Sequence, residues 1–239
     1  MEVFSGVGGL SKHLARAGVT PECWDIRHGS HFDLLKPANV RRLMKVIRKS
    51  GVIAVHLGTP CTTFSLARHP ALRSASHPWG KPDLDPQSQV KVQQGNALAR
   101  VSAMIMRVCI SKGIPFTIEN PQSSRIWLLE PFQKILAHPQ VQSHTLHFCQ
   151  YGTPWKKATT IAAFKFPRLS QAMRSCLGHG GLCSRTGKKH FQLSGKDSSG
   201  MWLTARGAAY PPQFCSAYSD ALIETVLGNF LHTQMNFIR

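Results

Sequence analysis

The sequence predicts an α/β fold in which helices cover both faces of a mostly parallel sheet. Short apolar runs of strand length alternate with amphipathic helical segments along most of the 239 residues. The nearly continuous apolar run at residues 52–57 is typical of a strand buried on both faces, as in a parallel sheet. Residues able to do chemistry directly follow such runs, on the side where open α/β sheets bind ligands.

The first part of the chain contains the pattern strand, glycine turn, helix. Residues 1–4 are an apolar run, and Leu10, Leu14 and Ala17 lie at helical spacing before Gly18, which ends this helix. We expect a short strand at 21–26, a helix with its apolar face at 40–47, and a strand at 52–57. Because a first strand normally has five or six residues, we expect the natural chain to extend upstream of residue 1.

The remainder of the chain continues the alternation and contains one break. Residues 67–88 have no period and predict a long loop, and a helix with apolar positions from Leu98 to Val108 ends near Gly113. We expect strands at 116–118, 144–148 and 159–163 and helices at 132–136 and 217–231. The predicted domains are a core at 1–163, a small basic Cys/His-rich insert at 164–199, and a C-terminal return to the core at 200–239.

The composition indicates a polyanionic partner. Lys and Arg number 29 against 11 Asp and Glu, giving a net charge of +18, which favours nucleic acid. An anionic membrane is disfavoured, because no apolar segment has spanning length and the basic residues do not gather on one helical face. No secretory signal is visible, and seven cysteines at irregular spacing fit reduced thiols. We therefore expect an intracellular protein of the nucleus or cytoplasm, of undetermined oligomeric state.

Three short motifs carry the chemistry. The glycine turn at residues 4–9 follows a strand and allows a ligand to approach the backbone, although a simple tight turn has the same pattern. Cys61 follows a buried strand in Gly-Thr-Pro-Cys, where it is either a nucleophile or a small core residue. The following Arg68, His69 and Arg73 would favour its thiolate. Glu119, in Glu-Asn-Pro after another strand, is either an acid in an apolar pocket or a turn residue.

The order of these motifs resembles that of the DNA cytosine-C5 methyltransferases. In sequence they are Phe-Ser-Gly-x-Gly-Gly, Pro-Cys-x-x-Phe-Ser and Glu-Asn-Pro. The resemblance implies a Rossmann-like class I fold that binds S-adenosylmethionine, with Cys61 attacking C6 of a flipped-out cytosine and Glu119 contacting N3. The implied cofactor-binding residues are Phe4, Gly6, Gly8, Gly9, Asp25, Asp33 and Pro60. The implied substrate-binding residues are Ser65, Arg68, Asn120 and Lys156, with Lys157 as a third catalytic residue.

The sequence also departs from this family. Lys156 and Lys157 stand where the family has arginines in a Gln-x-Arg-x-Arg element. Only eight residues separate Asp25 from Asp33, which is too short for a helix and a strand, so one element is expected to be trimmed. The insert is about half the length of the family's target-recognition region, which predicts weak reading of the target sequence or help from another chain.

The insert contains a possible zinc set. Two thiolates and two imidazoles satisfy tetrahedral Zn²⁺, and Cys176, His179, Cys183 and His190 provide them. The alternative is a metal-free basic loop, since seven basic residues and one acidic residue lie between 164 and 199. A metal would order a segment too polar to fold by burial alone.

Three functions remain open from the sequence. The first is a cytosine-C5 methyltransferase acting on nucleic acid, with DNA favoured over RNA because the motifs resemble those of DNA enzymes. The second is a catalytically inactive nucleic-acid-binding relative, which would have no use for Cys61 and Glu119 together. The third is a methyltransferase that acts on another substrate. This function is disfavoured, because a small neutral substrate would not require a charge of +18.

Overall fold

The computed structural model describes residues 1–49 and 51–237, and its centre is one six-stranded sheet. The strand order is β2 (Cys23–Trp24), β1 (Glu2–Val3), β3 (Val55–Leu57), β4 (Phe116–Pro121), β6 (Ala158–Phe164), β5 (Val141–His147). Neighbours from β2 to β4 are parallel, and β6 runs antiparallel to both β4 and β5. The sheet is therefore mostly parallel, which confirms the predicted fold class.

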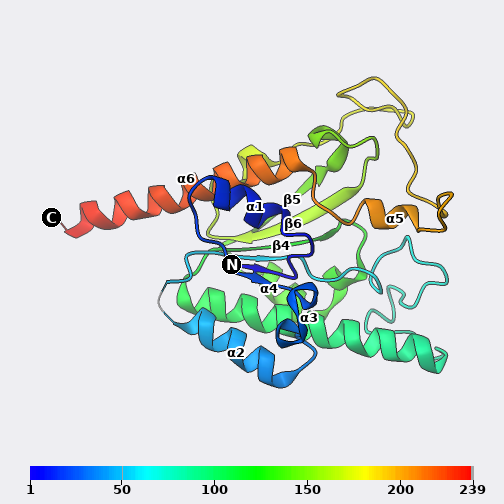
Figure 1. Cartoon of the computed structure of the whole chain (residues 1–239), viewed down its shortest axis with the longest axis horizontal. Coiled ribbons are helices and arrows are strands. Elements are labelled where there is room, and N and C mark those ends of the chain that lie inside the picture. The colour runs from blue at the N-terminus through cyan, green and yellow to red at the C-terminus, as the bar shows by residue number, and fades with distance from the viewer. Residues whose placement is uncertain (50, 238–239) are drawn as a thin grey trace.

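Helices cover both faces of the sheet (Figure 1). On one face lie α1 (Gly9–Arg16) and α6 (Pro212–Phe237), and on the other lie α2 (Pro37–Arg48), α3 (Pro86–Lys112) and α4 (Glu130–Leu136). The one-turn helix α5 is Leu203–Arg206, and the 3-10 turns are η1 (Ile26–His28), η2 (Ser30–Phe32), η3 (Arg125–Leu128), η4 (Phe148–Tyr151) and η5 (Leu169–Ala172). No helix of the described residues is both long and apolar enough to cross a membrane.

Two apolar cores hold these layers together. The larger lies under α2, α3 and α4 and includes Leu43, Ile105 and Phe132, each at most 1% exposed. The smaller lies under α1 and α6 and includes Leu10, Phe214 and Tyr218. Burying one such side chain contributes roughly 1.5–3 kcal/mol. The cores fix the strand ends that carry the candidate site.

The chain path reverses direction at one point of the sheet. After β1 the chain moves outward to β2, and it then returns to form β3 on the opposite side of β1. Connections leaving the carboxyl ends of β1 and β3 thus diverge, which is the topological position where open α/β sheets bind ligands. The glycine turn follows β1, and the loop bearing Cys61 follows β3.

Several segments differ in extent from the sequence expectation. α3 begins at Pro86, because the Asp85 side chain caps it by accepting a hydrogen bond from the Ser88 backbone N–H at 2.9 Å. The strand expected at 144–148 is β5 (Val141–His147), and Phe148 begins η4. Between Asp25 and Asp33 the chain forms only η1 and η2, as expected for a trimmed element.

Candidate active site

The glycine turn is built from left-handed backbone. Phe4 has φ +58°, Gly6 +55° and Gly8 +68°, and Gly8 precedes the first residue of α1. Left-handed φ is costly for most residues but not for glycine. A Cβ on Gly6 or Gly8 would meet no atom within 4 Å, whereas one on Gly9 would lie 3.1 Å from Cys215 Sγ of α6. Gly6 and Gly8 thus leave open space, and Gly9 allows two helices to pack closely.

Asp25 lies against this turn. Its Oδ2 accepts a hydrogen bond from the Gly6 backbone N–H at 2.9 Å, and its Oδ1 accepts one from the Arg27 N–H at 2.9 Å. His28, which sequence reasoning missed, has Nε2 3.3 Å from Ser5 Oγ. The first two parallel strands therefore bring an acidic residue and a histidine to the glycine turn.

Asp33 is positioned by a different contact. Its Oδ1 accepts a hydrogen bond from the Leu35 backbone N–H at 3.0 Å, and its backbone carbonyl accepts one from Asn39 Nδ2 at 2.9 Å. These contacts shape the turn that leads into α2. The cofactor contact assigned to Asp33 by resemblance stays a prediction.

The Cys61 loop is tied to the neighbouring strand. β3 and β4 are in parallel register with Leu57 opposite Ile118, so Glu119 lies one residue beyond this pair. Asn120, fully buried, donates from Nδ2 to the Thr59 carbonyl at 2.7 Å. Thr59 Oγ1 also lies 2.8 Å from Ser102 Oγ of α3. Asn120 thereby positions the loop, and its own Oδ1 has no hydrogen-bond partner among the described residues.

Charges of opposite sign act on the Cys61 thiol. Burial raises its pKa, the nearby carboxylate of Glu119 raises it further, and the ammonium of Lys157 opposes both. Cys61, Glu119 and Lys157 therefore lie close enough to interact at one end of the sheet. Lys157 Nζ is held by the Gly207 carbonyl at 2.7 Å and lies 4.4 Å from the centre of the Phe148 ring.

The cations following Cys61 in sequence play another part. Arg73 is buried, and its guanidinium donates to Thr63, Pro78, Val92 and Asn96 while lying 3.7 Å from the Phe64 ring centre. Burial lowers the pKa of Arg73 to about 10. Arg73 thus fastens the 64–81 segment to α3, and Lys157, from a distant segment, is the cation that acts on the thiol.

The other residues assigned to substrate have local contacts. Ser65 Oγ accepts a hydrogen bond from the Ala67 backbone N–H at 3.2 Å. Arg68 is half-buried, with a buried Nε that lacks a partner among the described residues, and Pro60 is half-buried next to Cys61. Lys156 lies near His147, whose pKa is lowered first by burial and then by that charge. Their roles stay predictions.

Glu119 ends a buried chain of hydrogen bonds that sequence reasoning missed. Its carboxylate accepts hydrogen bonds from the hydroxyls of Thr159 and Tyr210, the latter at 3.2 Å. Tyr210 OH lies 3.0 Å from His56 Nε2, and His56 Nδ1 lies 2.8 Å from Thr117 Oγ1. The chain thus links β3, β4, β6 and the segment before α6.

Burial determines the proton state of this chain. It lowers the pKa of His56 from 6.5 to about 3, so the imidazole is neutral at neutral pH. It raises the pKa of Tyr210 well above 10, assisted by the charge of Glu119. The tyrosine therefore keeps its proton and donates to Glu119. No local pattern marks these residues; only their meeting in the fold does.

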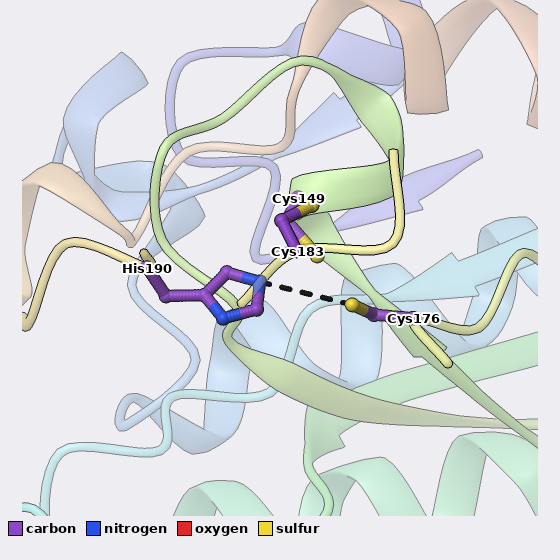
Figure 2. Close-up of side chains that lie close together, drawn as sticks. All are labelled: Cys149, Cys176, Cys183 and His190. Atoms are coloured by element: carbon purple, nitrogen blue, oxygen red, sulfur yellow. Dashed lines mark hydrogen bonds between the residues drawn. The ribbon is translucent and has the colours of Figure 1, made fainter. Parts of the chain in front are cut away.

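A second cluster lies at the junction of the core and the insert (Figure 2). Cys149 of η4, Cys176, Cys183 and His190 are all buried, and their ligand atoms lie within 4.8 Å of one another. Cys176 Sγ lies 3.7 Å from His190 Nε2. Three of the four residues proposed from the sequence thus come together.

The fourth residue of that prediction is replaced. His179 is exposed in the turn between Cys176 and Cys183 and lies outside the group, because its backbone carbonyl accepts from Leu182 at 3.0 Å to close the turn. Cys149, 27 residues before Cys176 in the chain, takes the fourth position. The sequence signal for Cys149 is weak, since it lies in an apolar segment far from the insert.

The thiols of this cluster have different environments. Burial opposes ionisation of Cys176 and Cys183, but hydrogen bonds from nearby backbone N–H groups and hydroxyls outweigh it. The pKa of Cys176 is lowered to about 5 and that of Cys183 to about 7. Burial raises the pKa of Cys149 to about 12. The insert thus surrounds two sulfurs with donors that favour thiolate.

Comparison with known proteins gives few relationships. No family model matches the chain, and no curated protein matches it. Among solved structures, a mutant of DNMT2 from Spodoptera frugiperda is similar at 15% sequence identity and a TM-score of 0.35. The similar region covers 68% of this chain and 48% of that one, so the chain spans about half the length of this structure.

Proposed function

We propose that the protein is an S-adenosylmethionine-dependent methyltransferase that acts on C5 of cytosine in nucleic acid. The observation that carries the proposal is the electrostatic contact between Cys61, in the loop after β3, and Glu119, near the carboxyl end of the adjacent parallel strand β4, beside the glycine turn that follows β1. A thiol and a carboxyl group at the carboxyl ends of two adjacent strands can act on two atoms of one planar base. We take DNA as the first substrate because of the motif resemblance.

The glycine turn fits the cofactor. Gly6 and Gly8 leave open space at the start of α1, and the N-terminus of a helix favours an anionic group such as a carboxylate. Asp25 is held next to them by the Gly6 N–H. Phe4, the glycines and Asp25 would hold S-adenosylmethionine, with Asp33 and Pro60 as further contacts. The bound cofactor supplies a methyl group whose bond to a sulfonium breaks, the electron pair staying on sulfur.

Cys61 provides the nucleophile in this scheme. The thiol passes its proton to the Glu119 carboxylate, the resulting thiolate forms an S–C6 bond, the C5=C6 electrons move toward C5, and N3 takes the proton from Glu119. After methylation N3 returns its proton to Glu119, water takes the C5 proton as the C5–H pair restores the C5=C6 bond, and Cys61 departs with the S–C6 pair and regains its proton from Glu119. Because burial and Glu119 raise the pKa of Cys61, the free protein keeps the thiol protonated. Lys157 is the group that favours thiolate.

The hydroxyls around Glu119 orient its carboxyl group. Thr159 and Tyr210 donate to its two oxygens, and neutral His56 keeps the Tyr210 hydroxyl in place. A proton carried by Glu119 would then be directed at the base. Tyr210 and His56 are positioning residues, and Asn120 positions the Cys61 loop through Thr59.

The charge of the chain supports nucleic acid as the substrate. A formal charge of +18 attracts phosphate along a strand, and Lys157 lies close enough to Cys61 to affect its pKa. A base must leave its stack to meet a nucleophile at the end of a buried strand. Neutral small substrates would gain nothing from this charge.

Covalent trapping tests the proposal. We would incubate the protein and S-adenosylmethionine with oligonucleotides that contain 5-fluorocytosine, in DNA and in RNA, because fluorine at C5 prevents release of the enzyme. We expect a stable methylated adduct with DNA that is absent in Cys61→Ser and present in Cys23→Ser, a half-buried cysteine of β2 outside the site. An adduct with RNA alone would overturn the choice of DNA.

A separate measurement distinguishes the inactive relative. Binding of S-adenosylmethionine and nucleic acid can be measured by titration calorimetry on the same preparations. Binding of both without any adduct would overturn catalysis and favour a nucleic-acid-binding protein. Binding of the cofactor without nucleic acid would favour another substrate.

A further inference from the structure

We propose that Cys149, Cys176, Cys183 and His190 bind one structural Zn²⁺ that fastens the insert to the core. This inference is independent of the proposed methyltransferase activity. It corrects the ligand set expected from the sequence by replacing His179 with Cys149.

The donor set and its size fit zinc. Three thiolates and one imidazole are a common tetrahedral set for structural Zn²⁺. Ligand atoms around such an ion lie roughly 3.3–3.8 Å apart, given metal–ligand distances of about 2.0–2.3 Å. The four atoms lie within 4.8 Å of one another, and Cys176 Sγ to His190 Nε2 is 3.7 Å. Four protein ligands fill the coordination sphere, which indicates a structural rather than a catalytic ion.

The side chains point toward a common centre. Figure 2 shows the three sulfurs and the imidazole converging from different segments. Cys149 lies in η4, Cys176 lies in the segment that follows η5, and Cys183 and His190 lie on the two sides of one turn. An isolated bridge between Leu182 and Lys189 pairs the two sides of this turn. The Cys183 N–H donates to the Lys188 carbonyl at 2.8 Å. Backbone pairing therefore places Cys183 and His190 on the two facing sides of one turn.

Backbone and side-chain N–H groups also support the sulfurs. The Ser184 N–H lies 3.4 Å from Cys176 Sγ, and Gln150 Nε2 lies 3.5 Å from Cys149 Sγ and 3.6 Å from Cys183 Sγ. Such donors stabilise metal-bound thiolate and fix its direction. A cluster that served only to fill space would have no need for them.

Gly178 allows the tight approach of these segments. A Cβ at this position would lie 2.0 Å from the Leu182 carbonyl oxygen and 2.8 Å from the Ser184 nitrogen. Real side chains never approach backbone so closely, so only glycine fits. The turn that brings Cys176 next to Cys183 depends on it.

The insert lacks another source of cohesion. Cys149, Cys176 and Cys183 form a buried cluster separate from both apolar cores. Large apolar side chains nearby are exposed, including Leu177, Leu182 and Phe191. Burial alone therefore stabilises this segment weakly, and a metal ion would supply the missing crosslink to η4.

Metal analysis of the purified protein tests the site. We expect about one zinc per chain by native mass spectrometry. In Cys149→Ser and in His190→Ala, the zinc bound per chain should fall on the order of tenfold or more. The matched control is His179→Ala, an exposed histidine of the same turn, which should retain zinc. Loss of zinc in His179→Ala but not in Cys149→Ser would overturn the assignment.

Two measurements on the unmutated chain avoid variants that fail to fold. Replacing zinc by Co²⁺ should give visible bands of a tetrahedral site and charge-transfer intensity from three thiolates. An intensity that fits only two thiolates would contradict the set of three cysteines. Chelation should also speed trypsin cleavage at the exposed Arg185, Lys188 and Lys189 by on the order of tenfold or more. A protein that contains no zinc and whose cleavage is insensitive to chelator would overturn the proposal.

Discussion

The carboxyl end of the sheet and the Cys/His cluster are organised by different physics. At the sheet, apolar cores on both faces hold β3 and β4 in place. These strands position polar groups such as Cys61 and Glu119 at their carboxyl ends. At the cluster, the three buried cysteines form a small group that is separate from both apolar cores. The first region orders its chemistry by burial, whereas the second needs a ligand for its order.

The same residue type illustrates the contrast. Burial and Glu119 raise the pKa of Cys61, whereas N–H and hydroxyl donors lower that of Cys176 to about 5 despite its burial. A thiol that must be deprotonated before it reacts suits a nucleophile, whereas a thiol already stabilised as thiolate suits a metal ligand. The comparison yields four predictions, ordered from the largest expected effect.

Replacing Glu119, the proposed acid, should have the largest effect on activity. Glu119→Gln keeps the shape of the side chain and removes the transferable proton, so turnover of cytosine substrate should fall about 10²–10⁴-fold. Single-turnover methyl transfer from labelled cofactor measures it. Glu130→Gln, on the exposed surface of α4, is the control. Equal rates for Glu119→Gln and the unmutated protein would exclude Glu119 as the acid.

Removing metal should affect only the second region. After chelation, hydrogen exchange of backbone amides at Gly187 and His190, which donate to Cys183 and Gly181 carbonyls, should accelerate on the order of 10²-fold. Exchange in β4 and β6 should not change, because their order comes from the cores. Mass spectrometry of peptides resolves the two regions. Acceleration spread over the whole sheet would contradict independent sources of order.

Acid should weaken the first region through His56. Its pKa is lowered by burial from 6.5 unfolded to about 3 folded, so between these values the unfolded chain binds the extra proton. The stabilising contribution is complete above pH 6.5 and is lost as pH falls toward 3, by up to about 1.4 kcal/mol per pH unit. Urea unfolding from pH 7 to 5 measures the slope. His56→Gln should flatten it, whereas the exposed His77→Gln should not.

Substituting the glycine turn should have the smallest effect on stability. Gly6→Ala places a Cβ on a residue with φ +55° and open surroundings, which costs about 1 kcal/mol of backbone strain. Gly18→Ala, with φ +80° and equally open surroundings, should cost a similar amount. Only Gly6→Ala should weaken S-adenosylmethionine binding, as measured by calorimetry. Equal affinities for the two variants would remove the turn from the cofactor site.

Local pattern was sufficient for much of this molecule. Apolar runs and helical spacing predicted the alternating elements, because burial imposes those periods on any strand or helix. Cys61 and Glu119 were recognisable because each comes at the end of an apolar run, and parallel strands end on the same side of a sheet. The strand expected at 116–118 continues to Pro121, so Glu119 lies within β4 and pairs with Ile161 of β6. The trimmed stretch between Asp25 and Asp33 was also visible from its length alone.

Only the tertiary structure decided which distant residues meet. Tyr210 reaches His56 across 154 residues, and Cys149 joins Cys176 while the nearer His179 turns outward. Arg73 is close to Cys61 in sequence, but its guanidinium donates to Asn96 of α3, and Lys157 acts on the thiol instead. Residue types and periods are properties of short segments, so sequence alone determined them. Contacts across long loops depend on the path of the whole chain and on close packing, which no short segment encodes.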